Sequence, residues 1–241
     1  MEKLAGKIIM IIGATGGIGG VLSRAFHDEG AHVILSARTE SKLKLLADSL
    51  GNTRSTITAF DASNASEVER ALDITFSSFG SLDAVIIASG TWKTATLEIS
   101  TEDFSELLDD HFLQHLKSSA VVAFAAAKKF STQGYGHIIN ISSHAGSNYS
   151  LPGNLTYGPL KEASSGFMAR LGFDKGLHEN VQITDIRPAI VNTKDARESF
   201  LDTKEKQALA VQPEDIAHWI ASNLNHPNAP GVIDFKSDLV I

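Results

Sequence analysis

The feature that most constrains this chain is a continuous apolar run that ends in a cluster of glycines. Residues 8–12 are all apolar, and glycine follows at positions 13, 16, 17 and 19. An apolar run without alternation predicts a strand buried on both faces, as in a parallel sheet. After the glycines the spacing becomes helical, with one apolar face formed by Ile18, Val21, Leu22, Ala25 and Phe26. The order strand, glycine loop and helix predicts an α/β fold with a dinucleotide site at the helix N-terminus.

Each glycine of this loop has a predicted role. Gly13 allows the sharp turn, Gly17 leaves no side chain between backbone and phosphate, and Gly19 lets the helix lie close to the sheet. A flexible turn that binds nothing is the alternative, but the strand before and the amphipathic helix after it favour a nucleotide site. No G-K-S or G-K-T follows the loop, which disfavours a P-loop nucleotidase.

Composition narrows the class of protein. The 241 residues carry a formal net charge of −7 and contain no cysteine. We expect a single domain over 1–241, located in the cytoplasm and without disulfides or thiolate metal sites. No stretch approaches the roughly 18 apolar residues of a membrane span, and we expect no targeting segment. The acidic balance and the dispersed basic residues argue against nucleic acid as a partner.

The histidines do not form a known metal-binding pattern. The chain has nine of them, but no H-E-x-x-H motif occurs. His111 and His115 are spaced to share a helix face, although such a pair is more often packing or solvated surface than a pair of ligands. We therefore predict no metal site.

The end of the second predicted strand, residues 32–36, should lie beside the adenosine ribose. An Asp or Glu there would bind the 2'-hydroxyl, but this chain has Ala37, Arg38 and Thr39. A guanidinium can hold a 2'-phosphate and no carboxylate is present to repel it, so the sequence favours NADP over NAD. The alternative is an arginine that is merely solvated on a loop.

The remaining chain alternates between strands and helices, as in a parallel sheet with crossovers. Asp61 follows a third strand and either binds the adenine amino group or only terminates the strand. After the fourth strand, the small residues Ser89 and Gly90 would let a cofactor lie close. Residues 101–130 are predicted to be helical. Further strands are predicted at 137–141, 181–186 and 232–235, and a last helix at 213–223.

Ser143, Tyr157 and Lys161 have the residue types that a carbonyl reduction needs. A free tyrosine has a pKa of about 10, and a nearby ammonium, together with the positive charge of an oxidised nicotinamide, favours the phenolate and lowers that pKa. Lys161 follows Tyr157 by one helical turn on the same face. Ser143 ends a strand at the expected cofactor edge, where it would bind the substrate oxygen while Tyr157 passes the proton. A solvated lysine and an amphipathic tyrosine are the alternative, but together with the glycine loop the set is specific.

These motifs resemble the short-chain dehydrogenase/reductase family over nearly the whole length. The resemblance implies one Rossmann-type domain with a seven-stranded parallel sheet, helices on both faces, and assembly as a homotetramer or homodimer. It gives Ser143, Tyr157 and Lys161 the catalytic roles, and the stretch at residues 37–39 is similar to that of NADP-preferring members. By the same resemblance, the cofactor would contact Gly13, Thr15, Gly16, Gly17, Ile18, Gly19, Arg38, Thr39, Asp61, Ala62, Ser89, Gly90, Tyr157, Lys161, Pro188, Ile190 and Thr193.

The chain departs from the family pattern at several places. The usual Asn-Asn-Ala-Gly is Ile-Ala-Ser-Gly at 87–90, a loss that the fold should survive. The helical asparagine of a proton relay is replaced by His115 or, in another alignment, by His111; a histidine relay and a tolerated loss are both open. Pro159 cannot lie in a helix interior, so we predict that its helix begins near Thr156.

Residues 194–212 mix apolar and charged side chains, and we predict that they form a substrate lid. Trp92, Tyr149 and Leu151 are candidate wall residues of the pocket. The sequence thus predicts an NADP-dependent oxidoreductase that interconverts a small-molecule carbonyl compound and its alcohol. A non-catalytic NADP(H)-binding redox sensor on the same fold is the alternative. A sugar epimerase is disfavoured because only about 48 residues follow Thr193, which leaves little room for a substrate domain.

Overall fold

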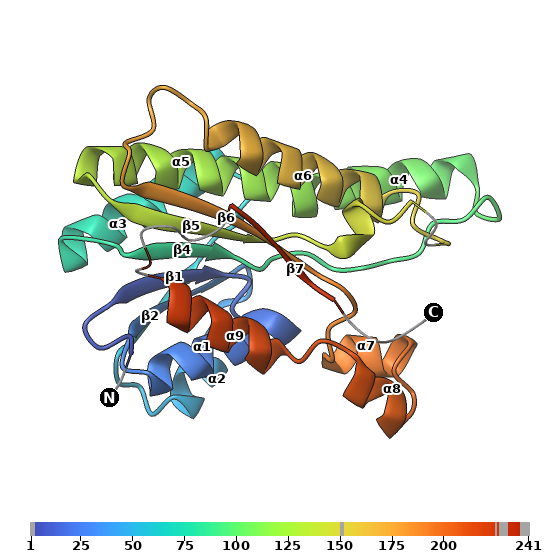
Figure 1. The fold of residues 1–241 in the computed structure, drawn as a ribbon, viewed down its shortest axis with the longest axis horizontal. Coiled ribbons are helices and arrows are strands. Elements are labelled where there is room, and N and C mark those ends of the chain that lie inside the picture. The colour runs from blue at the N-terminus through green and yellow to red at the C-terminus, as the bar shows by residue number, and fades with distance from the viewer. Residues whose placement is uncertain (1–2, 150–151, 225, 227–230, 237–241) are drawn as a thin grey trace.

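A seven-stranded parallel sheet forms the centre of the molecule in the computed structural model, which describes residues 3–149, 152–224, 226 and 231–236 (Figure 1). The strand order is β3-β2-β1-β4-β5-β6-β7, and every neighbouring pair is parallel. The strands are β1 Ile8–Ile12, β2 His32–Ala37, β3 Ser55–Ala59, β4 Ala84–Ile87, β5 Gly136–Ile141, β6 Val181–Pro188 and β7 Val232–Phe235. The predicted doubly wound fold is confirmed.

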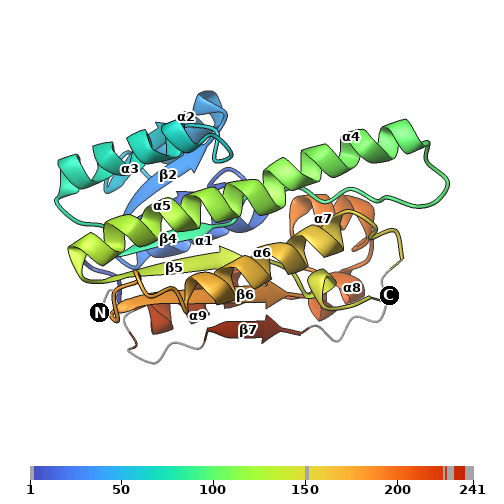
Figure 2. The ribbon, with the colours of Figure 1, turned by 90° about the horizontal axis from the view of Figure 1, so that it is seen from above.

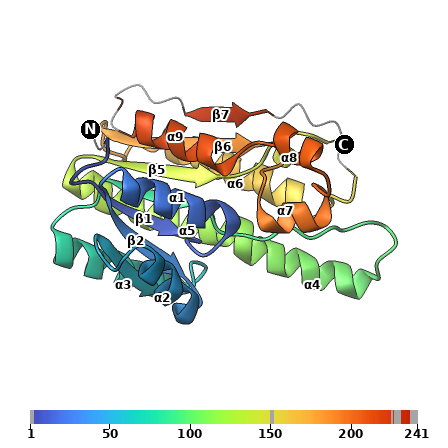
Figure 3. The same cartoon turned by 90° about the horizontal axis from the view of Figure 1, so that it is seen from below.

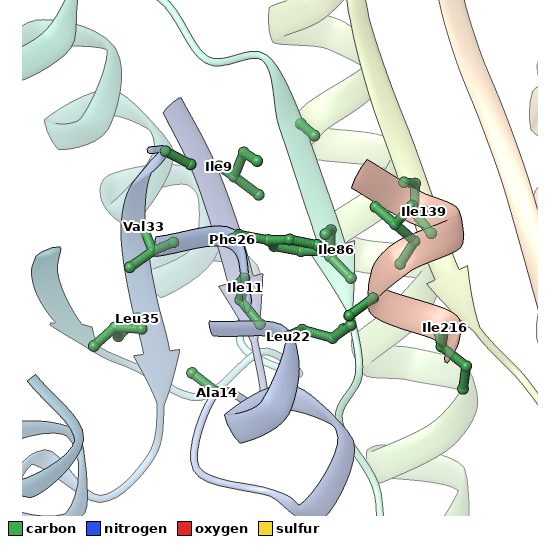
Figure 4. Close-up of a cluster of buried hydrophobic side chains, with 14 of the residues drawn as sticks. Ile9, Ile11, Ala14, Leu22, Phe26, Val33, Leu35, Ile86, Ile139 and Ile216 are labelled. Carbon is green, nitrogen blue, oxygen red and sulfur yellow. The ribbon is translucent and has the colours of Figure 1, made fainter. Parts of the chain in front are cut away.

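The continuous apolar run of β1 is explained by burial on both faces of the sheet. Ile9 and Ile11 belong to one buried cluster, whereas Met10 and Ile12 point to the other. Figure 4 shows the first cluster, in which Phe26 of the following helix packs across the strands. A strand in this position gains from apolar residues at every position, so the alternation typical of a half-solvated strand is absent.

Two layers of helices cover the sheet. On one face lie α1 Gly17–Asp28, α2 Glu40–Ser49 and α9 Pro213–Asn223 (Figure 3). On the other lie α3 Ala65–Phe79, α4 Thr101–His111, α5 Ser118–Gln133 and α6 Tyr157–Leu171 (Figure 2). The short helices α7 Lys194–Ser199 and α8 Lys204–Leu209 lie beyond the carboxyl ends of the strands, at the same end of the molecule as α4.

The predicted helical region 101–130 is observed, but it is not uniform. A π-helical turn, η1 (Phe112–Lys117), joins α4 to α5, and the helical region continues to Gln133. A π-turn widens the helix by one residue and is frequent at functional sites. Here it carries His115, whose side chain is buried.

The predicted start of the helix that carries Tyr157 and Lys161 is also observed. Thr156 precedes the first residue of α6, and Pro159 is the third residue of the helix. The first helical turn leaves N–H groups without helical partners, so the missing N–H of proline costs little there. Pro159 therefore sets where the helix begins. Among the residues described, no helix combines the length and the apolar character that crossing a membrane requires.

Candidate active site

The carboxyl ends of β1, β4, β5 and β6 are neighbours in the sheet, and the predicted site residues follow them directly. The glycine loop follows β1, Ser89 and Gly90 follow β4, and Ser143 follows β5. The loss of an asparagine at 87–90 does not disrupt β4, which pairs with both β1 and β5. The first turn of α6 completes this edge with Tyr157 and Lys161.

Tyr157 and Ser143 are brought together as predicted. A hydrogen bond joins their side-chain hydroxyl groups, and Ser143 Oγ also accepts from the Ala145 N–H at 3.1 Å. Burial raises the pKa of the Tyr157 phenol, and the hydrogen bond to Ser143 only partly opposes this rise. Among the protein groups, desolvation disfavours the phenolate more than the neighbouring groups favour it. The predicted lowering of this pKa also depends on the charge of an oxidised nicotinamide, so it stays a prediction for the protein with cofactor bound.

Lys161 is buried and lies beside Tyr157. Its Nζ is 5.7 Å from the centre of the Tyr157 ring and donates a hydrogen bond to the Ile141 carbonyl oxygen at 3.0 Å. Burial lowers the pKa of Lys161 to about 8, while the carboxylate of Asp185 acts in the opposite direction. The lysine is thus close to its titration range at neutral to mildly alkaline pH, unlike an ordinary surface lysine.

His115 lies against Tyr157, with ring centres 4.9 Å apart and the rings nearly perpendicular. Its Nε2 is 2.8 Å from the Thr91 carbonyl oxygen, which can only accept, so Nε2 carries the proton. Burial, and then the charge of Lys161, lowers the pKa of His115 to about 2. The ring is therefore neutral at physiological pH, and its buried Nδ1 is an acceptor that has no partner in the described part of the chain.

His111 also lies in this cluster but farther from Tyr157, at 6.1 Å between ring centres. Its Nδ1 is 2.9 Å from Thr156 Oγ1, and its ring is 5.1 Å from that of His115. Burial is the main cause that lowers the pKa of His111. Of the two histidines left open by the sequence, His115 is therefore the one in closer contact with the tyrosine.

The glycine loop has the geometry of a phosphate cradle. Gly16 is the N-cap residue of α1, and its position provides no side-chain hydrogen bond to the first turn of the helix. Gly13 has φ of +84°, and a Cβ there would lie 2.8 Å from the Ala88 carbonyl oxygen. A Cβ on Gly19 would lie 2.2 Å from the Gly13 carbonyl oxygen. Free N–H groups and a backbone without side chains fit the pyrophosphate of a dinucleotide.

Thr193 lies over this cradle. A Cβ on Gly17 would come within 2.7 Å of the Thr193 side chain, so the loops after β1 and β6 touch at this point. Thr193 also caps the N-terminus of α7, since its Oγ1 accepts from the Ala196 N–H at 3.3 Å. Pro188 ends β6, and the Ile190 carbonyl accepts from Val211. Of the predicted contacts at 188–193, Thr193 therefore lies next to the glycine loop.

The predicted ribose end is exposed. Arg38 and Thr39 follow β2 directly and lie on the surface, as does Asp61 after β3. Asp61 Oδ1 accepts from both the N–H and the hydroxyl of Ser63 at 2.8 Å, and this backbone hydrogen bond is the main cause that lowers the pKa of Asp61. Asp61 thus stabilises the turn after β3, which agrees with its alternative role as a strand terminator. Ala62 is half-buried in the same turn.

The remaining predicted site residues differ in burial and in their contacts. The buried Ser89 Oγ has no partner among the described residues, and Gly90 has φ of +122°. Thr15, Gly16 and Gly17 are exposed, and Ile18 is half-buried. Trp92 contacts Phe200 of the predicted lid, with ring centres 4.6 Å apart. Tyr149 is exposed and donates to Glu162 Oε1 at 2.6 Å, and Leu151 lies outside the described residues.

Sequence reasoning missed Thr91, Thr156 and Asp185. Thr91 and Thr156 act through contacts with His115 and His111 that no local pattern indicates. Asp185 had a signal, because it is a charged residue within a strand that is otherwise predicted to be buried. A charge at such a position requires partners, and these are supplied by neighbouring elements.

The fold and the edge of the sheet define a Rossmann-like α/β protein with a serine, a tyrosine and a lysine beside a glycine loop. Residues 7–204 match the family model of the short chain dehydrogenases. The chain belongs to the short-chain dehydrogenase/reductase family, whose members are oxidoreductases that use a nicotinamide cofactor and act on small molecules.

Known proteins are similar over almost the full length. The chain is 30% identical over 230 residues to the 3-oxoacyl-[acyl-carrier-protein] reductase FabG of Rickettsia conorii, covering 92% of this chain and 90% of that protein. A solved 7α-hydroxysteroid dehydrogenase, in complex with NADH and 7-oxo glycochenodeoxycholic acid, aligns with a TM-score of 0.84 at 22% identity over 98% of this chain and 94% of that one. ElxO with NADP bound aligns with a TM-score of 0.77 at 21% identity, covering 95% and 96% of the two chains.

Proposed function

We propose that this protein is an NADP(H)-dependent oxidoreductase that interconverts a carbonyl compound and its alcohol, with Tyr157 as the general acid and base. The observation that carries the proposal is the hydrogen-bonded pair of Tyr157 and Ser143, with Lys161 one helical turn further along α6. This arrangement stands at the carboxyl edge of the sheet, beside the glycine loop. Ligands of doubly wound sheets bind at that edge.

When bound, the reduced nicotinamide supplies the hydride. The Ser143 hydroxyl donates a hydrogen bond to the substrate carbonyl oxygen, which orients and polarises that group. Tyr157 then transfers its phenolic proton to the same oxygen as negative charge develops there. The raised pKa of Tyr157 keeps the phenol protonated at neutral pH, which suits the reduction direction. The Lys161 ammonium stabilises the phenolate that remains.

His115 has a positioning role in this scheme. A ring whose pKa is lowered to about 2 does not carry a proton as an imidazolium at neutral pH. Its Nε2–H instead donates a hydrogen bond to the Thr91 carbonyl oxygen, which positions the loop that follows β4 beside the active site.

Arg38 supports a preference for NADP over NAD. It is exposed at the end of β2, and among the described residues its one recorded electrostatic partner is Asp61. A guanidinium that is not held in an ion pair is available for a 2'-phosphate. ElxO, which has NADP bound, and the hydroxysteroid dehydrogenase, which has NADH bound, show that similar folds accept either cofactor. The preference therefore depends on Arg38 and Thr39 rather than on the fold.

The segment 194–212 is proposed to be a substrate lid that is hinged at both ends. Leu201 is fully buried and Val211 pairs with Val191, so parts of the segment are anchored to the body of the protein. Its outer part, α7 and α8, lies beyond the sheet, and Phe200 contacts Trp92 across the site. Closure of such a segment would exclude water from the reaction.

We further propose that the protein forms a homo-oligomer and is located in the cytoplasm. Apolar side chains are exposed along α4 to α5, including Leu108, Phe112 and Phe124, which supports a homodimer or homotetramer. Sedimentation velocity of the purified protein tests this, and a monomer at micromolar concentration would contradict it. A cytoplasmic location is proposed because the chain contains no cysteine.

The function is tested by NADPH oxidation with a panel of ketones, quinones, aldehydes and a 3-oxoacyl thioester. Tyr157→Phe should still bind NADPH but lose turnover by about 100-fold or more, because it lacks the transferable proton. Tyr135→Phe, a half-exposed tyrosine just before β5, is the matched control and should match the wild type. NADPH binding without Tyr157-dependent turnover on any of these substrates would favour the redox-sensor alternative.

A further inference from the structure

Asp185 is a buried carboxylate in the middle of β6 that the scheme above does not use. Its exposed fraction is 1%, and no lysine, arginine or histidine of the described residues forms an ion pair with it. An isolated buried carboxylate is costly unless hydrogen bonds or a nearby charge compensate it. Its retention inside the sheet therefore requires an explanation.

Three donors surround this carboxylate. Asn140 Nδ2 donates to Oδ1 at 2.7 Å, while the hydroxyls of Ser142 and Ser165 donate to Oδ2 at 2.9 and 2.6 Å. The second hydrogen of the Asn140 amide goes to Ser164 Oγ at 3.3 Å. Each of these groups can donate a hydrogen bond to a carboxylate oxygen, so the buried carboxylate is not left without partners.

The topology explains why these groups meet. Asn140 of β5 is the register partner of Asp185, and Ser142 lies two residues further on the same face of β5. Ser164 and Ser165 follow Lys161 by three and four residues, so all three share the face of α6 that covers the strands. The carboxylate of Asp185 therefore lies beneath α6, about one helical turn from Lys161.

The Asp185 carboxylate acts electrostatically on the ammonium of Lys161. The titratable groups that face its ammonium are His111 and His115 from α4 and η1, Tyr157 from its own helix, and Asp185 from β6. The two histidines are neutral, and the Tyr157 phenol is protonated. Asp185 is the negative charge of this group, and it favours the protonated lysine against the effect of burial.

We propose that Asp185 is a positioning residue for Lys161: hydrogen-bonded to Asn140, Ser142 and Ser165, its carboxylate anchors α6 about one turn beyond Lys161 and places a negative charge near the buried ammonium. The inference rests on the proposed function in one respect, namely that the charged Lys161 stabilises the Tyr157 phenolate during turnover. The location of the carboxylate and its effect on the lysine do not depend on turnover.

The test is a pH titration of Lys161 by NMR of protein labelled with ¹³C at the lysine Cε, with the resonance assigned by its loss in Lys161→Arg. In Asp185→Asn, the midpoint should move to lower pH than in the wild type, by roughly one pH unit, because Asp185 favours the protonated lysine. Asp234→Asn, which removes a half-exposed carboxylate from β7, is the matched control and should leave the midpoint unchanged. An unchanged midpoint in Asp185→Asn would overturn the proposal.

A wild-type measurement keeps the proposal testable if Asp185→Asn does not fold. The side-chain carboxyl ¹³C resonance of Asp185, assigned by through-bond correlation, should have the chemical shift of an ionised carboxylate at pH 7. A protonated carboxyl at that pH would also overturn the proposal.

The pH dependence of turnover provides an independent test. If the wild type reduces a substrate, the alkaline limb of its pH profile should move to lower pH in Asp185→Asn by the same amount as the NMR midpoint, and Asp234→Asn should not move it. A limb that stays in place while the midpoint moves would refute the link to catalysis. If the wild type shows no turnover, the proposed function fails, and the NMR titration alone decides the role of Asp185.

Discussion

Replacing His115 with asparagine should make the fold less sensitive to mild acid. His115 is buried against Tyr157, and its pKa falls from 6.5 to about 2 because burial disfavours the charged ring. In the unfolded chain the same histidine takes up a proton below about pH 6.5. The unfolded state then binds more protons than the folded state, so the free energy of unfolding decreases as pH falls from 6.5 towards 2.

The size of the effect follows from this difference. At pH 5 the unfolded histidine is about 1.5 pH units below its pKa, and each unit is worth about 1.4 kcal/mol, so His115 lowers the free energy of unfolding by about 2 kcal/mol. His137, whose pKa burial lowers to about 4, contributes a loss of the same sign. That second contribution remains in His115→Asn, so the readout is the difference between variant and wild type.

Urea unfolding followed by circular dichroism at pH 7 and pH 5 measures this difference. The loss of stability between the two pH values should be smaller by about 2 kcal/mol in His115→Asn than in the wild type. Asparagine retains a donor for the Thr91 carbonyl, which limits other changes. His218→Asn, on the exposed face of α9, should behave as the wild type. Equal losses in His115→Asn and the wild type would refute a neutral, buried His115.

Three further outcomes are expected. Gly19→Ala should lower the free energy of unfolding by about 1–3 kcal/mol, because the added Cβ would lie 2.2 Å from the Gly13 carbonyl oxygen. Its control is Gly20→Ala, where the nearest new contact is the flexible Arg24 side chain at 3.4 Å. Urea denaturation should show this control to be neutral or slightly stabilising. Arg38→Gln should raise the KM for NADPH by about 10- to 100-fold and leave the KM for NADH unchanged in steady-state kinetics, and equal effects on both would remove the argument for NADP. Phe26→Ala should cost about 3–5 kcal/mol in the same denaturation assay, and a much smaller loss would show that the cluster in Figure 4 repacks.

Local spacing was sufficient to predict most of the fold. The apolar run at 8–12 indicated a strand covered on both faces, and that is how β1 is buried. Pro159 indicated that a helix begins at Thr156–Tyr157, because proline is tolerated only in a first turn. The π-turn at 112–117 was not predicted, since its apolar pattern does not differ from that of an α-helix.

The sequence by itself determined the order of elements and the juxtaposition of Ser143 with Tyr157, because both depend on residue periodicity and on the shared edge of parallel strands. Only the tertiary structure decided the charge states at that edge. Tyr157 has a raised pKa, His115 is neutral, and Lys161 faces a carboxylate from β6. These properties depend on desolvation and on charges contributed by elements distant in the chain, and no local pattern encodes either.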